Sequence, residues 1–280
     1  MSEWIKWTAG AAGLAALAGA GVVGVRQWQF ARQWRAMDTA LGGLHADATF
    51  DAAVLADLPA PAQRYLRHAL AEGAPLARSA RIAMTGRMKP TPDAEFVDLT
   101  AEELLAPPVG FLWTAKLSMG PVLIRVRDHY YRGAGEVRVE PFGLVPIQRE
   151  TGPDVTRSSR HRLAAEALWM PSALVPGPGV AWEAIDARRA RATVTVDGEA
   201  IPLTLTVDDA GRLERLTMER YGDVNVPSWR PIPYGFAVEA EATFGGCTVP
   251  TRLRGGWWFG TDRYRPEAAS TFTIQSIQYR

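Results

Sequence analysis

Three residues between positions 160 and 170 could form a polar contact site on one face of a predicted helix. Arg162, Glu166 and Trp169 stand at i, i+4 and i+7, so a helix places all three on one stripe. In a ligand groove, Glu166 would be the polar contact, Arg162 would orient it and Trp169 would cover it. The alternative is a surface ion pair beside a packed indole, and the spacing is compatible with both.

Two predicted strands carry charged residues on faces that are otherwise apolar. In one strand the apolar face continues into Asp128 and Tyr130, and in another, residues 215–221, it continues into Arg220. A charge that is buried alone is costly, so each charged group needs a partner. We therefore predict that Arg220 pairs with Asp128 or Glu166 at one end of a groove. The alternative is that these side chains reach solvent at the strand ends.

Motifs of catalysis and of metal or nucleotide binding are not found in the sequence. There is no G-x-S-x-G, no H-E-x-x-H and no glycine-rich loop in a strand-turn-helix context. The four histidines lack ligand spacing and Cys247 is the single cysteine, so neither a metal site nor a cofactor is predicted. Paired carboxylates need not be close in sequence. An enzyme that uses Glu166 or Asp128 as acid or base therefore remains an alternative.

The composition describes a folded chain without a strong overall charge. The 280 residues include 31 Lys and Arg and 30 Asp and Glu, and 47% are hydrophobic. This content predicts a globular core rather than disorder. The near-balance of charge gives no electrostatic argument for a nucleic-acid partner.

The first part of the chain predicts attachment to a membrane. Residues 8–25 contain no charged side chain and are just long enough to cross a bilayer as a helix. We assign residues 1–25 to a membrane anchor and residues 26–58 to a helical connector next to the membrane. A cleaved signal peptide is the alternative, because Ala18-Gly19-Ala20 offers small residues after an apolar stretch.

The orientation of this anchor is less clearly indicated. Arg26, Arg32 and Arg35 follow the apolar segment, and the positive-inside bias would leave the main domain in the cytoplasm. Long domains can nevertheless translocate despite flanking charge. We expect a single-pass protein of the bacterial inner membrane with an extracytoplasmic domain, and the cytoplasmic orientation is kept as an alternative.

The rest of the chain, residues 59–280, predicts one domain of mainly antiparallel β-structure. A helix begins at Pro61 and another begins at Asp154 and runs to about Met170, whereas most of the other segments alternate with period two. Asp197-Gly198 between two alternating runs indicates a hairpin. About ten strands and few helices predict an α+β fold in which one large sheet curls into a half-barrel. The second helix is placed in the sequence to cover the concave face.

Two segments resemble the signature of an uncharacterised bacterial family, a domain of unknown function. Residues 162–174, RLAAEALWMPSAL, resemble its R-Y-L-A-E-x-x-W-x-P-x-A-L pattern, departing at Leu163, and residues 58–66, LPAPAQRYL, resemble its L-P-x-P-V-Q-R-Y-L segment. The order of strands and helices is also similar to the periplasmic lipoprotein carriers. That resemblance implies a curved half-barrel that holds acyl chains.

Together these patterns favour an anchored extracytoplasmic protein that holds a lipid or other hydrophobic ligand in a curved groove. The candidate ligand residues are Arg162, Glu166, Trp169, Asp128, Tyr130 and Arg220. An enzyme acting on a lipid-like or small apolar substrate and a non-catalytic structural protein of the envelope are the alternatives. A continuous apolar cavity above about 300 Å³ would favour ligand binding over a structural role. Convergence of two carboxyl groups in that cavity would strengthen the enzyme alternative.

Overall fold

The chain divides into two compact units in its computed structural model, residues 1–40 and residues 41–280. The structure describes residues 3–89 and 94–280, but not the side chains of residues 3–20, 22 and 119. Helix α1 (Glu3–Gly42) makes up the described part of the first unit. None of the described helices combines the length and the hydropathy needed to cross a membrane. Most of the predicted anchor lies outside the described side chains, and the anchor stays a prediction.

The second unit is built around one antiparallel sheet, with thirteen strands among the described residues. The strands are β1 (Ala80–Met88), β2 (Val97–Ala106), β3 (Gly110–Met119), β4 (Val122–Tyr131), β5 (Ala134–Pro141), β6 (Gln148–Thr151), β7 (Val180–Ala184), β8 (Arg189–Val196), β9 (Glu199–Val207), β10 (Leu213–Gly222), β11 (Arg230–Phe244), β12 (Cys247–Trp257) and β13 (Ser270–Tyr279). The helices of this unit are α2 (Ala60–Ala69) and α3 (Pro153–Glu166), with short 3-10 helices η1 (Ala52–Leu55), η2 (Ala167–Trp169), η3 (Pro171–Leu174) and η4 (Pro266–Ala268).

The order of the strands gives the sheet two arms that meet at its centre. The order is β6-β5-β4-β3-β2-β1-β13-β12-β11-β10-β9-β8-β7. Strands β1 to β6 form one arm as a meander and β7 to β13 form the other. The two arms join where β1 pairs with β13, with Ala80 opposite Tyr279. The segment that runs from edge strand β6 to edge strand β7 contains α3, so the chain crosses from one arm to the other at that point.

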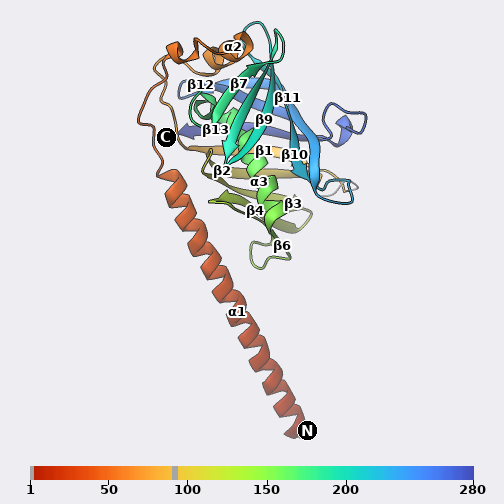
Figure 1. Cartoon of the computed structure of the whole chain (residues 1–280). Helices are drawn as coiled ribbons and strands as arrows, with labels where there is room; N and C mark the ends of the chain where they lie inside the picture. The colour runs from red at the N-terminus through yellow and green to blue at the C-terminus, as the bar shows by residue number, and fades with distance from the viewer. Residues whose placement is uncertain (1–2, 90–93) are drawn as a thin grey trace. The chain divides into compact units, whose positions relative to one another are not determined.

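Helix α3 lies across the concave face of this curved sheet (Figure 1). It packs against β3, β4, β5 and β6 of the first arm and against β8, β9 and β10 of the second. Helix α2 packs elsewhere, against β7, β8, β9 and β12. Its buried residues include Ala62, Tyr65, Leu66 and Ala69, which is the apolar stripe of an amphipathic helix. Each helix therefore buries its apolar side on the sheet.

The predicted fold class, a large curved sheet with few helices, is confirmed for the second unit. The edge strands β6 and β7 are the hardest to predict from the sequence pattern, because they have only four and five residues. All four residues of β6 are exposed, so the strand has no alternation of apolar and polar side chains. The hairpin at Asp197-Gly198 is present, and both residues have positive φ, as a two-residue hairpin turn requires.

Residues 41–58, which the sequence analysis placed in the connector, contribute to the second unit. Phe50 and Leu55 are buried in its core. Phe50 also exchanges backbone hydrogen bonds with Gly73 and Ala74. These residues therefore belong to the core of the second unit, and η1 packs against α2.

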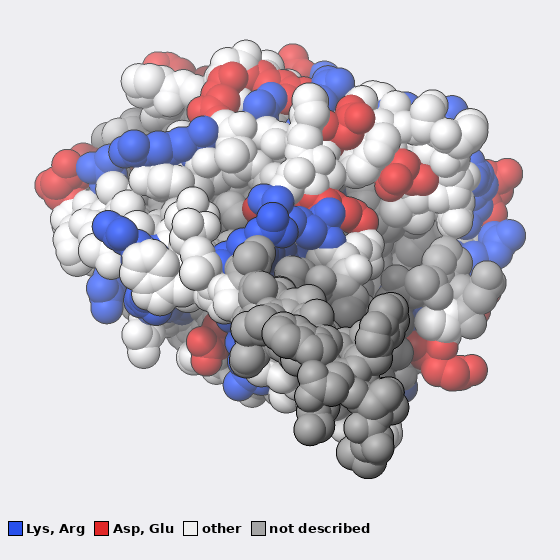
Figure 2. All heavy atoms as spheres, turned by 90° about the horizontal axis from the view of Figure 1, so that it is seen from below, with Lys and Arg blue, Asp and Glu red and all other residues white. Residues whose placement is uncertain are grey.

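Charged side chains of both signs lie interspersed on the face of the molecule in Figure 2. The Lys and Arg side chains of the described residues occur in short groups with Asp and Glu nearby. The net charge of the whole chain is +1. The described part of this face therefore offers no extended field of one sign, such as the field that steers nucleic acids.

Candidate ligand cavity and its charged residues

A cavity of about 290 Å³ lies between α3 and the concave face of the sheet. This volume lies just below the range of ligand pockets, about 300–1,000 Å³, and just below the threshold set above for favouring ligand binding. The walls are mostly apolar and aromatic: Met84, Met88, Trp113, Val126, Val137, Ala165, Leu168, Trp169, Tyr234, Phe236, Leu253, Gly256, Trp257 and Phe272. The polar lining consists of Asp128, Arg162, Glu166, Arg220 and Ser270. Five of the six candidate ligand residues therefore line one cavity, and the sixth, Tyr130, does not.

Arg162 is the centre of a buried charge cluster at the cavity wall. Its Nε donates to Glu166 Oε1 at 2.6 Å and its Nη1 donates to Asp128 Oδ2 at 2.6 Å. Its guanidinium carbon lies 4.6 Å from the centre of the Phe111 ring and 5.0 Å from that of Trp113. The side chain is 14% exposed. The pair is therefore not an isolated surface ion pair: it is part-buried and includes a strand residue, Asp128.

A third carboxyl, Glu103 on β2, completes this cluster and was not a predicted site residue. Its Oε1 lies 3.6 Å from Arg162 Nη2, and its side chain is 0% exposed. Burial and the Glu166 carboxylate raise the pKa of Glu103 well above its usual 4.5, against the lowering effect of Arg162. The sequence does carry the signal, because Glu103 has the parity of Val97, Leu99 and Ala101 on the buried face of β2. Reading that parity would have found it.

The three acids stabilise the charged form of Arg162 at this site. Burial alone would lower the pKa of Arg162, but Glu166, Asp128 and Glu103 together raise it above its ordinary value. One cation thus faces three carboxyl groups. The raised pKa of Glu103 limits the repulsion inside the cluster, because it disfavours a third negative charge there.

Arg220 lines the same cavity but does not join this cluster, so its predicted pairing with Asp128 or Glu166 is wrong. No Asp or Glu of the described residues lies within 4.0 Å of its guanidinium. The guanidinium carbon instead lies 4.7 Å from the ring centre of Tyr234 and 4.9 Å from that of Trp257. Strands β4 and β10, which carry Asp128 and Arg220, belong to opposite arms of the sheet. Asp128 is instead paired with Arg162, which comes from the helix that crosses between the arms.

Trp169 follows α3 in η2 and closes part of the cavity. Its side chain is 6% exposed, and its Nε1 donates to the carbonyl of Pro250 at 3.1 Å. Tyr279 donates its hydroxyl hydrogen bond to the Trp169 carbonyl at 2.7 Å. The indole is therefore a fixed wall of the cavity whose polar atom is already satisfied, and only its ring surface is available to a guest.

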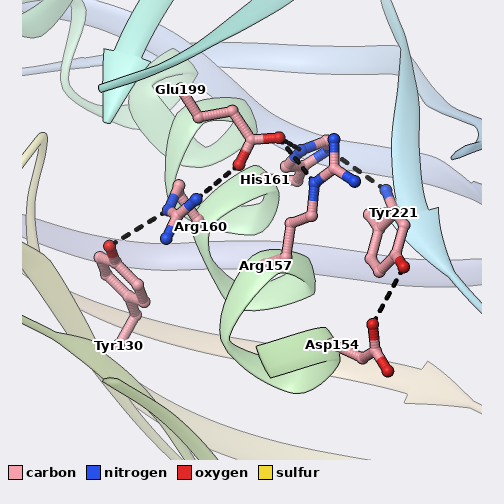
Figure 3. Close-up of polar contacts among 7 residues, drawn as sticks. All are labelled: Tyr130, Asp154, Arg157, Arg160, His161, Glu199 and Tyr221. Atoms are coloured by element: carbon pink, nitrogen blue, oxygen red, sulfur yellow. Dashed lines mark hydrogen bonds and ion pairs between the residues drawn. The ribbon is translucent and has the colours of Figure 1, made fainter. Parts of the chain in front are cut away.

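Tyr130 belongs to a second polar cluster, at the first half of α3 (Figure 3). Its hydroxyl donates a hydrogen bond to Asp197 and accepts one from Arg160 Nε at 3.3 Å. Arg160 Nη1 lies 2.6 Å from Glu199 Oε2, and Arg157 Nε lies 2.7 Å from Glu199 Oε1. Tyr130 is on the first arm of the sheet and Glu199 on the second. The cluster therefore links both arms through α3.

His161 in this second cluster lies between the backbone of β10 and the Glu199 carboxylate. Its Nδ1 accepts the backbone N–H of Tyr221 at 3.2 Å, so this nitrogen carries no proton and the Nε2–H is the one that faces Glu199 Oε1, 3.0 Å away. Burial lowers the pKa of His161, against the raising effect of Glu199. Burial alone would raise the pKa of Glu199, but hydrogen bonds from His161, Arg157 and Arg160 lower it to about 2.

Replacing Glu199 with glutamine is expected to lower the free energy of unfolding by about 1–2 kcal/mol at pH 7, because charge-assisted hydrogen bonds on the partly exposed carboxylate are lost. The pKa of Glu199 is depressed from 4.5 to about 2 in the folded state. Its contribution is therefore complete above pH 4.5 and is lost as the pH falls toward 2. Urea unfolding at pH 7 and at pH 3 measures both effects.

The control for this prediction is Glu183→Gln, which breaks an ion pair with Arg191 in which the Glu183 side chain is 57% exposed. Such a pair contributes about 0–1 kcal/mol. Equal stability losses in the two variants at pH 7 would show that Glu199 is an ordinary surface residue.

The remaining reactive groups of the described residues include neither a metal-binding cluster nor an activated thiol. No group of three His, Cys, Asp or Glu side chains there has the geometry to hold a metal ion. Burial raises the pKa of the Cys247 thiol to about 11, so it is not ionised at neutral pH and is a poor nucleophile. The chemistry of the cavity therefore comes from its apolar walls and its charged residues.

A curved antiparallel sheet with a helix across its concave face and a small apolar cavity between them defines the class of this protein. Within that class, a match over residues 48–266 shows that the chain belongs to the family of unknown function DUF6544. The predicted membership of a family without a known function is thus confirmed. The comparison with curated proteins found no relative.

Three solved structures are similar to this chain at low sequence identity. A domain from Vibrio parahaemolyticus, provisionally named as an outer membrane lipoprotein-sorting protein, has a TM-score of 0.40 and 8% identity and covers 72% of this chain and 85% of its own. A DUF1329 family protein from Desulfovibrio piger has a TM-score of 0.40 and 10% identity, covering 72% of this chain and 86% of its own. A LolA superfamily protein from Nitrosomonas europaea has a TM-score of 0.39 and 14% identity, and the match covers 79% of this chain and 92% of that protein.

Proposed function

We propose that the protein is a binding protein that holds a hydrophobic ligand, a lipid or an acyl chain, in the cavity under α3. The observation that carries this proposal is the cavity itself, about 290 Å³ in volume and lined mainly by apolar and aromatic side chains. Its few polar groups gather around Arg162 and Arg220. An apolar pocket with a few fixed polar groups is the usual form of a small-molecule site.

Filling the cavity tests this proposal. The native full-length chain, released gently from its host membranes, is expected to carry a bound lipid that native mass spectrometry detects as added mass. Val126 lines the cavity, so Val126→Phe should reduce the lipid-bound fraction several-fold by occupying the space. Val54 is 50% exposed on η1, and Val54→Phe is the matched control that should leave this fraction unchanged.

If neither the unmodified chain nor Val126→Phe carries added mass, the result would contradict ligand binding and would favour the structural role. Thermal unfolding of both variants shows whether they remain folded. If Val126→Phe unfolds, Val137→Phe, on the neighbouring strand and also at the cavity, makes the same test.

The convergence of carboxyl groups supports a second candidate function, an enzyme acting on a lipid-like or small apolar substrate. Asp128 and Glu166 both line the cavity, and either could act as acid or base on a bound substrate. Incubation of the full chain with a lipid extract of its host, followed by mass spectrometry of the lipids, tests it. Turnover that Glu166→Gln or Asp128→Asn abolishes would support the enzyme, and unchanged lipids would contradict it.

Membrane attachment through residues 1–25 is a separate part of the proposal. It is supported by the charge-free stretch of residues 8–25 and by the tryptophans on either side of it. We propose that residues 59–280 lie outside the cytoplasm. Fractionation of cells that express the full chain or a chain lacking residues 2–25 tests the anchor, and protease added to intact spheroplasts tests the side. A full chain that fractionates with the soluble proteins would contradict the anchor.

A further inference from the structure

Arg220 differs from every other charged residue of the cavity in lacking a counter-charge. Asp128 and Glu166 both pair with Arg162, whereas the guanidinium of Arg220 has no Asp or Glu of the described residues within ion-pair distance. Its Nε is buried and has no hydrogen-bond acceptor. A guanidinium stays charged at all physiological pH values. The fold therefore keeps a fixed positive charge at the cavity with unused donors.

The surroundings of Arg220 hold this charge in one place. The guanidinium carbon is within 5 Å of the ring centres of both Tyr234 and Trp257, and both rings line the cavity. Aromatic faces attract a guanidinium and restrict its side-chain motion. They do not, however, accept the hydrogen bonds of its N–H groups in the way that a carboxylate does.

Glycine 222 makes this arrangement possible. A Cβ at Gly222 would lie 2.3 Å from Cη2 of the Trp257 ring, so any larger residue would displace the indole. Gly222 ends the strand that carries Arg220, two residues away. The backbone is thus shaped to let Trp257 lie against Arg220.

The rest of the cavity can take an apolar tail. Met84, Met88, Leu253 and Phe272 come from the central strands β1, β12 and β13, so an apolar wall extends across the junction of the two arms. The volume of about 290 Å³ is small for a ligand pocket. It suits one chain better than the two or three chains of a membrane lipid.

From these observations we propose that the cavity binds a single-chain amphiphile with an anionic head group, a carboxylate or a phosphate, which Arg220 holds. This inference rests on the proposed binding function and adds the chemical class of the ligand. Asp128 and Glu166 outnumber Arg162 by one negative charge, so the anionic head group is expected to lie at Arg220, which is apart from this cluster. The anion supplies the acceptors that the N–H groups of Arg220 lack.

Four probes with the same twelve-carbon chain test the proposal: dodecanoate, dodecyl phosphate, dodecanol and dodecylammonium. Each is added at equal concentration to the delipidated full-length chain, and native mass spectrometry measures the occupied fraction. We expect dodecanoate, dodecyl phosphate or both to bind about tenfold or more tightly than dodecanol, because bidentate charge-assisted hydrogen bonds are gained. The ratio between the two anions distinguishes a carboxylate from a phosphate head group.

Arg220→Met should remove this preference and leave the binding of dodecanol unchanged, and Arg220→Lys should keep part of it. Arg215 is exposed on the same strand, so Arg215→Met is the matched control and should behave as the unmodified chain. Thermal unfolding monitors the fold of each variant. If Arg220→Met does not fold, the comparison of dodecanoate with dodecanol in the unmodified chain still tests whether the cavity prefers an anionic head group.

Equal binding of all four probes would overturn the anionic head group while supporting the hydrophobic cavity. Preference for dodecylammonium, or an anion preference that survives in Arg220→Met, would also overturn the role of Arg220. Binding of none of the probes would instead contradict the proposed binding function itself. The failure of the inference is therefore distinguishable from the failure of the function.

Discussion

Replacing Arg162 with methionine is expected to lower the free energy of unfolding at pH 7 by about 3–5 kcal/mol, the cost of leaving buried charges without their partner. Arg162 contacts Asp128 and Glu166 at 2.6 Å and Glu103 at 3.6 Å. Without the guanidinium, three carboxyl groups share a buried site with no cation among them. Methionine keeps the volume of the stem, so the effect measures mainly the charge.

The pH dependence separates this explanation from a simple packing defect. In Arg162→Met the carboxyl groups of this site have no cation beside them, so their protonation should favour the folded state. The loss of stability relative to the unmodified chain should then be smaller at pH 5 than at pH 7. Urea unfolding followed by tryptophan fluorescence at pH 5 and pH 7 measures the difference. A variant that is equally destabilised at both values would contradict the electrostatic explanation.

A compensating variant provides the control. Combining Arg162→Met with Asp128→Asn and Glu166→Gln removes the uncompensated charges, and a buried ionic cluster replaced by neutral groups is often close to neutral in stability. We expect this triple variant to recover most of the loss. If it is no more stable than Arg162→Met alone, the methionine side chain itself disrupts the packing.

Trp169→Ala is expected to lower the free energy of unfolding by about 3–5 kcal/mol, as for other buried aromatic residues cut back to alanine. The indole is 6% exposed and belongs to the main core. Its removal also leaves the Pro250 carbonyl without its donor, which adds the cost of an unsatisfied buried group. Thermal and urea unfolding measure the loss.

Trp169→Phe and Trp28→Ala are the controls for this prediction. Phenylalanine keeps the ring but not the donor to Pro250, so an intermediate loss is expected. Trp28 is 57% exposed, and its truncation should change stability by about 0.5 kcal/mol or less. A Trp169→Ala variant as stable as Trp28→Ala would show that the indole is not an essential wall of the cavity.

Alternation with period two predicted the face on which Asp128 and Arg220 lie. Asp128 and Arg220 follow the parity of their apolar neighbours, and both line the cavity. The same parity places Glu103 on the buried face of β2. Side-chain direction along a strand is a local property, which is why the sequence contains it.

The same alternation could not predict which residues pair with Asp128 and Arg220. Parity assigns a face but not a position across the sheet, and eight neighbouring strands run from β4 to β10 inclusive in the sheet order. The partner of Asp128 comes from α3, whose path depends on the long connection between the two edge strands. Helix α3 also ends at Glu166, before the predicted Met170, because the chain tightens into η2 at Ala167. Such choices depend on tertiary packing rather than on local propensity.

The position of β13 between β1 and β12 determines when this protein can finish folding during synthesis. The meander from β1 to β6 leaves the ribosome early, but the inner edge of β1 has to wait for β13, which is translated after every other strand. Contacts of such large sequence separation form slowly. Until then, an unpaired strand edge and a half-covered apolar surface are exposed, which is the kind of intermediate that recruits chaperones.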